Sequence, residues 1–216
     1  MSDAALDHEF QYPSAKHQAE TAVSGMWLFL ATEVLFFGAL FLAWFFARHW
    51  NLAGFDAGAQ RTQLAIGTIN TVILVTSSLT YSAGLAFIAA GNVRRLMQCL
   101  AATWLLGLAF LILKFGLEWG KDFADHLWPG PDFAVVGPLG RGAQLFFSFY
   151  FIATAIHGLH MVVGLGLVAW IMLLARRGRL SAGYRTPVEA VGLYWSFVDM
   201  VWLVLYPLIY LVGRAP

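Results

Sequence analysis

The sequence contains little charge and almost no cysteine. Only 12% of its 216 residues are charged, whereas 60% are hydrophobic. Soluble domains carry roughly 25% charged residues, so this composition excludes an ordinary soluble domain and indicates a polytopic membrane protein. The single cysteine, Cys99, excludes a disulfide within the chain and a thiolate metal cluster. We interpret it as a small, buried, apolar residue.

The sequence also contains no basic cluster and no pattern that predicts a signal peptide. Its formal net charge is +1, and no cluster of Lys and Arg alternates with aromatic residues. A nucleic-acid surface requires such a cluster, so we expect no nucleic acid as a partner. Residues 1–23 carry four acidic residues against one lysine and have no apolar core, which is not the pattern of a cleavable signal peptide. We expect them to be a cytoplasmic N-terminal segment.

Long apolar runs dominate the remainder of the chain. Five of them reach the length of about 20 residues that crosses a bilayer. We predict an all-α fold, with a bundle of five transmembrane helices in a membrane domain at residues 24–216. The predicted spans are residues 25–46, 65–89, 97–117, 145–175 and 188–212. The longest connection, residues 119–143, is rich in glycine and proline, which predicts a loop. The densest group of arginines lies between the last two spans, so the positive-inside rule predicts a cytoplasmic N-terminus and a periplasmic C-terminus.

Ionisable residues within the spans are candidate functional residues, because they are costly at membrane depth. His157 and His160 are three residues apart and share a helical face. With Glu118 they could in principle hold a metal, but no third histidine and no repeated Glu-x-x-His pattern supports one. We therefore predict no metal site. Lys114 can pair with Glu118 one turn away, and we expect these two residues and both histidines to form a polar cluster between the third and fourth spans.

Glu33 lies in the first span without a partner on its own helix. The residues one turn before and after it are apolar, and burial disfavours an isolated carboxylate. Two interpretations follow. Glu33 either meets a partner on another helix, or it is a proton-exchanging or carbodiimide-reactive acid.

The fifth span carries a stripe of amphipathic side chains on one helical face. Trp195, Asp199, Trp202 and Tyr206 follow one another at spacings of four, three and four residues. Such a stripe is typical of packing, and in a membrane it also indicates contact with another polar helix, a lipid head group or a neighbouring subunit. Asn70, in the second span, is a further candidate for hydrogen bonding between helices and for lipid or subunit contact.

Five short segments carry a family resemblance. They are Ser-Gly-Met-Trp-Leu-Phe-Leu-Ala-Thr-Glu-Val-Leu-Phe-Phe-Gly at 24–38, Asn-Thr-Val-Ile-Leu at 70–74 with two serines at 77–78, Leu-Glu-Trp at 117–119, His-Gly-Leu-His at 157–160, and Tyr-Trp-Ser-Phe-Val-Asp-Met-Val-Trp at 194–202. In this order they resemble cytochrome oxidase subunit III, in the five-helix bacterial form that lacks the first two of seven helices. The sequence departs from the family at Ser196, where a histidine is common.

The resemblance implies a non-catalytic subunit of a haem-copper respiratory oxidase in the bacterial inner membrane. It implies partnership with catalytic subunit I and other oxidase subunits, with haem and copper held by the catalytic subunit and none by this chain. It also implies roles in assembly, phospholipid binding and sustained proton uptake, with Glu33 as the carbodiimide-reactive acid. The electron donor, cytochrome c or quinol, is a property of other subunits.

Two alternatives remain open from the sequence. An accessory subunit of a nitric oxide reductase would share these motifs. A stand-alone membrane metalloenzyme would use His157, His160 and Glu118 as metal ligands.

Overall fold

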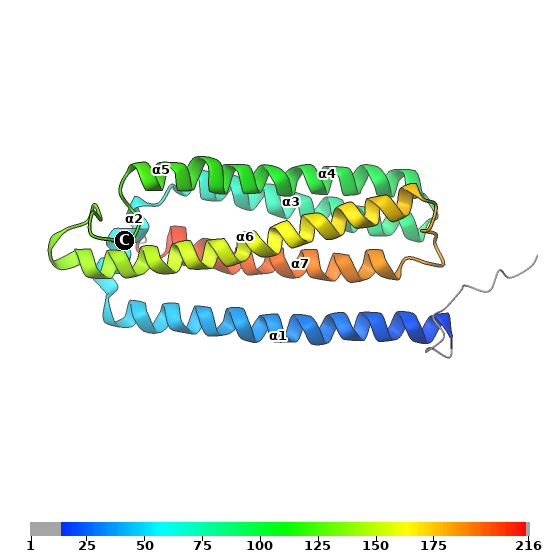
Figure 1. Ribbon diagram of the computed structural model, residues 1–216, viewed down its shortest axis with the longest axis horizontal. Coiled ribbons are helices and arrows are strands. Elements are labelled where there is room, and N and C mark those ends of the chain that lie inside the picture. Colours follow the sequence, from blue (N-terminus) through cyan, green and yellow to red (C-terminus); the bar gives the residue numbers. More distant parts are fainter. Residues whose placement is uncertain (1–13, 215–216) are drawn as a thin grey trace, which may run out of the picture.

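The computed structural model describes residues 14–214, and all the regular elements in that part of the chain are helical (Figure 1). The elements are α1 (Ala15–Trp50), α2 (Leu52–Arg61), α3 (Leu64–Ala89), α4 (Val93–Leu111), the π-helix η1 (Ile112–Glu118), α5 (Trp119–Ala124), the 3-10 turn η2 (Gly137–Leu139), α6 (Gly140–Arg176), α7 (Thr186–Tyr206) and the π-helix η3 (Pro207–Leu211). Five stretches are long and apolar enough to cross a membrane. The predicted all-α bundle of five spans is confirmed.

The spans run up and down the bundle in alternation. Figure 1 shows α1 along one edge, starting at the end opposite to the one that holds α2, α5 and the C-terminus. Helix α7 is the most covered of the five spans, and α1 is the least covered. The aromatic and aliphatic side chains of α7 therefore form the centre of the core, whereas α1 leaves most of its apolar surface uncovered by the chain itself.

The helices extend beyond the predicted spans. The first span was expected at residues 25–46, but α1 contains 36 residues. Ser14 caps its first turn by accepting a hydrogen bond from the His17 amide. Hydrophobicity marks only the part of a helix that crosses the bilayer, whereas backbone hydrogen bonding continues through the polar residues on either side. Of the predicted cytoplasmic segment, residues 1–13 lie outside the described residues and the rest begins α1.

The long connection expected after the third span is shorter than predicted. Residues 119–143 were interpreted as a loop because they are rich in glycine and proline. Instead, α5 continues the third span and α6 already begins at Gly140. One reason is packing: Gly142 lies against Gly54 of the short helix α2, and a side chain at either position would collide with the opposite backbone.

This close approach gives a testable prediction. A Cβ added to Gly54 would lie 2.5 Å from the Cα of Gly142. Because backbone atoms cannot move aside, Gly54→Ala is expected to lower the free energy of unfolding by about 1–3 kcal/mol. Gly38→Ala is the control: it is also helical but has nothing within 4 Å of the new Cβ. Thermal unfolding in detergent measures both, and equal melting temperatures would contradict the tight α2–α6 contact.

Candidate functional site

Glu33 and His160 meet at the contact between α1 and α6. Glu33 Oε2 lies 3.1 Å from His160 Nε2, although the residues are 127 positions apart. The other ring nitrogen, Nδ1, lies 2.8 Å from the carbonyl oxygen of Ile156. Both side chains are partly exposed, at 18% and 16%. Glu33 therefore has a hydrogen-bond partner on another helix, and its role as a proton-exchanging acid stays a prediction.

The geometry fixes the number of protons in this pair. The Ile156 carbonyl can only accept, so His160 Nδ1 must carry a hydrogen and donate it. The contact between Nε2 and Glu33 then requires one further proton, either on the carboxyl or on an imidazolium. The two groups thus share one proton between them.

Aromatic side chains surround the pair. Phe37 lies edge-on to the His160 ring, with centroids 5.2 Å apart, and Phe197 packs against Phe37. Tyr194 donates a hydrogen bond of 3.0 Å to the backbone oxygen of His160. These contacts hold the imidazole in position in an apolar environment beside α1, the least covered of the five spans.

His157 lies elsewhere. It is buried, and neither ring nitrogen has a hydrogen-bond partner among the described residues. Its ring packs against Phe110 and Trp202, with centroids 5.5 and 5.2 Å apart. The predicted cluster that joins both histidines to Glu118 is therefore wrong in its geometry. The reason is that adjacent turns of α6 face different neighbours, α1 at His160 and α7 at His157.

Lys114 and Glu118 do form the predicted pair. Their charged atoms are 3.0 Å apart and both side chains are fully buried. Three residues that the sequence analysis missed complete the group: Asp122, Tyr150 and Tyr210. Asp122 could have been found, because it continues the spacing of four residues from Lys114 through Glu118. The tyrosines carry no such signal, since a tyrosine in an apolar helix is usually a packing residue.

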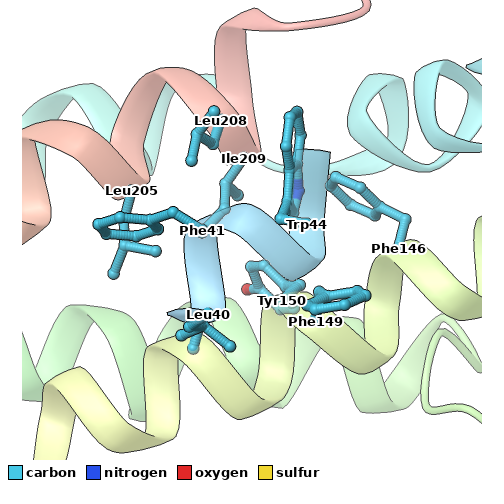
Figure 2. Close-up of a pocket in the computed structure, with 10 residues that line it drawn as sticks. Leu40, Phe41, Trp44, Phe146, Phe149, Tyr150, Leu205, Leu208 and Ile209 are labelled. Atoms are coloured by element: carbon cyan, nitrogen blue, oxygen red, sulfur yellow. The ribbon is translucent and has the colours of Figure 1, made fainter. Parts of the chain in front are cut away.

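A small apolar cavity separates this group from α1. It has a volume of about 10 Å³ and lies between α1, α6, α7 and η3. Figure 2 shows Tyr150 at this cavity beside Phe149, with Trp44 and Phe41 of α1 above them. The other lining residues are apolar as well. The α1 side therefore offers Tyr150 no polar partner.

The polar stripe of the fifth span binds α3. Trp195 donates to Ser77 at 3.1 Å, and Trp202 donates to Thr71 at 3.0 Å. Asp199 accepts a hydrogen bond from Ser78, and the Tyr206 hydroxyl lies 2.8 Å from that of Thr68. The stripe thus contacts a polar helix, as one interpretation proposed, and that helix belongs to the same chain. Trp195, Trp202 and Asp199 are buried, so they are not positioned to contact lipid or another subunit directly.

Asn70 is also buried, and neither side-chain polar atom has a partner among the described residues. It therefore makes no lipid or subunit contact at the surface. In residues 14–214 no three His, Cys, Asp or Glu side chains lie close enough together to hold a metal ion. The proposed ligands of a metalloenzyme, His157, His160 and Glu118, point to different neighbours.

Comparisons with known proteins identify relatives of this chain. Residues 133–214 match the family model of cytochrome c oxidase subunit III. Subunit 3 of the cytochrome bo(3) ubiquinol oxidase of Pseudomonas aeruginosa is 31% identical, with 96% of this chain and 90% of that protein covered. Cytochrome c oxidase subunit 3 of Thermostichus vulcanus is 29% identical over 97% of this chain and 94% of its own length.

A relative that is much longer than this chain is also similar to it. A haem-copper oxidase subunit I+III of Aeropyrum pernix is 29% identical over 88% of this chain, and the match spans 22% of that protein. The match to the bo(3) subunit extends along nearly the whole of both chains, and the structure has the membrane spans that such a subunit needs. This chain therefore belongs to the cytochrome c oxidase subunit III family and is a multi-pass membrane protein.

Proposed function

We propose that this chain is the non-catalytic subunit III of a bacterial haem-copper respiratory oxidase and that it sustains proton uptake during oxygen reduction. The observation that carries the proposal is the Glu33–His160 pair, which shares one proton at a partly exposed, apolar position. The proton can lie on the carboxyl beside a neutral imidazole, or on the imidazole beside a carboxylate, and its release leaves one negative charge on Glu33.

The names of the relatives support a partnership with the catalytic subunit. The protein of Aeropyrum pernix is named as subunit I+III, a single chain for both parts. In our proposal, this chain packs beside a separate subunit I that holds the haem and copper. Relatives named for cytochrome c oxidase and for ubiquinol oxidase are both similar to this chain, so either donor is compatible with the proposed role.

Phospholipid is the proposed second partner. A recess of about 360 Å³ lies between α1, α3 and α7, lined by apolar residues together with Ser82, Glu189 and Ser196. An acyl chain fits the apolar lining, and the polar groups suit a head group. Arg185, paired with Glu189 at 2.7 Å and 43% exposed, adds a cation at the same end. We place this end at the cytoplasmic face of the inner membrane by the positive-inside rule.

The experiment replaces Glu33 by glutamine in the assembled oxidase. Glutamine keeps the shape of the side chain but removes the shared proton. We expect initial oxygen consumption close to wild type, a severalfold shorter lifetime during continuous turnover, and slower proton uptake. Oxygen-electrode traces and pH-indicator kinetics on purified enzyme in vesicles measure these quantities.

Asp132→Asn is the matched control, because Asp132 is an exposed acid outside the helices. It should leave lifetime and proton uptake unchanged. If Glu33→Gln also left both unchanged in a fully assembled complex, the proposed proton role would be lost. Phospholipid analysis of the same preparations tests the lipid role separately, since the recess does not include Glu33.

A further inference from the structure

A second ionisable group lies buried away from the Glu33–His160 pair. Lys114 and Glu118 of η1 and Asp122 of α5 follow one another at intervals of four residues. All three are at most 2% exposed. Tyr150 of α6 and Tyr210 of η3 complete the group, which we call the ionic cluster.

The hydrogens of Lys114 are fully used within the ionic cluster. Its ammonium group lies 3.0 Å from the Tyr150 hydroxyl, 2.7 Å from the Tyr210 hydroxyl and 3.0 Å from Glu118 Oε1. An ammonium group has three hydrogens, so these three acceptors saturate it. Each tyrosine, having accepted from Lys114, has a single hydrogen left to donate.

The remaining contacts contain one acceptor too many. Tyr210 donates its hydrogen to Glu118 Oε1. The Tyr150 hydroxyl lies 2.6 Å from Asp122 Oδ2 and 3.0 Å from Glu118 Oε1, but its one hydrogen can serve only one of them. Glu118 Oε2 is buried and accepts no hydrogen bond from the described residues. The cluster therefore has more acceptor oxygens than hydrogens.

The charges of the ionic cluster also indicate that one proton is missing. One lysine cation faces two carboxyl groups, so full ionisation would leave one uncompensated negative charge inside the bundle. Burying an unpaired charge costs many kcal/mol, and such a group is neutralised instead. A single additional proton removes the excess charge and supplies the hydrogen that the second contact of the Tyr150 hydroxyl lacks.

We propose that the ionic cluster is a proton-binding site that holds one proton, shared by Asp122 and Glu118 through the Tyr150 hydroxyl. With the proton on Asp122, its carboxyl donates to Tyr150 and Tyr150 donates to Glu118. When both hydrogens shift along these two hydrogen bonds, the proton resides on Glu118 and Tyr150 donates to Asp122. No atom other than hydrogen moves, and the total charge is unchanged.

The position of Asp122 provides the exchange route. Its neighbours Lys121 and Asp125 are exposed at the end of the bundle, so Asp122 is the member closest to bulk water. Other titratable groups around the cluster are Asp125 after α5, Tyr206 of α7 and His157 of α6 behind the Trp202 ring. The cluster is also built on a π-helix, a feature that recurs at functional sites.

Infrared spectroscopy of the assembled complex tests the proposal directly. A protonated carboxyl group has a C=O stretching band that an ionised one lacks. We expect part of this band at neutral pH to disappear in Asp122→Asn and in Glu118→Gln. It should shift in Tyr150→Phe, which keeps both acids but removes the bridge. Asp125→Asn, at the exposed neighbour, is the control and should leave the band intact. An unchanged band in both acid variants would overturn the proposal.

A stability measurement covers the case in which Glu118→Gln does not assemble. If the folded chain holds a proton that the unfolded chain has lost, the folding equilibrium constant falls as pH rises, by up to about tenfold per pH unit. This fall begins above about pH 4, where a free carboxyl ionises, and ends once the cluster releases its proton. Asp122→Asn carries no excess charge and should lack this fall, whereas Asp125→Asn should keep it. Parallel pH profiles for wild type and Asp122→Asn would overturn the proposal.

Discussion

Replacement of Lys114 by methionine is expected to lower the free energy of unfolding by about 3–5 kcal/mol, because it leaves the buried carboxyls without their cation. Methionine has a similar length, so the loss of packing is small. Lys114 is 1% exposed and touches Glu118, Tyr150 and Tyr210 at 3.0 Å or less. Denaturant or thermal unfolding in detergent measures the change.

The same replacement at the exposed Lys121, seven residues further on, should change stability by less than about 0.5 kcal/mol. Adding Glu118→Gln to Lys114→Met should recover part of the loss, because the two charges interact directly. If Lys114→Met and Lys121→Met had the same free energy of unfolding, the ionic cluster would not stabilise the folded chain.

Replacement of Trp202 by alanine should lower the free energy of unfolding by a similar amount, about 3–5 kcal/mol. Trp202 is fully buried at the centre of the bundle. Its ring lies edge-on to Phe110 and tilted against His157, with ring centroids 4.7 and 5.2 Å away, and its indole donates to Thr71. Alanine would leave a large cavity and remove the bond that joins α7 to α3.

Trp50→Ala is the control for this prediction, since Trp50 is 71% exposed at the end of α1. Its removal should cost far less in detergent, where its ring has few protein contacts to lose. Trp202→Phe should be intermediate, because the ring remains while the hydrogen bond is lost. Equal losses of unfolding free energy in Trp202→Ala and Trp50→Ala would contradict a core centred on α7.

The sequence predicted those features that depend on local spacing. Apolar runs located the five spans, and an interval of four residues located the Lys114–Glu118 pair. The sequence did not predict the Glu33–His160 contact. The two residues are 127 positions apart, on α1 and α6, and no local pattern indicates how those helices pack. Tyr150 was missed for the same reason, since its role depends on an acid supplied by another helix.

Composition alone was misleading at the connection between the third and fourth spans. Glycines at 140 and 142 suggested a loop, yet both lie within α6, and the lack of a side chain at Gly142 allows α2 to approach. Asp122 was placed in that loop and so was not recognised as a buried acid. In both cases a residue type that usually marks a turn or a surface is used for packing between helices.

The central claim is that this chain works as a subunit of a haem-copper oxidase. Purification through a tag on this chain in mild detergent, followed by a reduced-minus-oxidised visible spectrum and mass spectrometry, tests it most directly. The account predicts haem absorption bands together with a large multi-helix catalytic subunit in constant proportion. A colourless protein recovered without that subunit would contradict it.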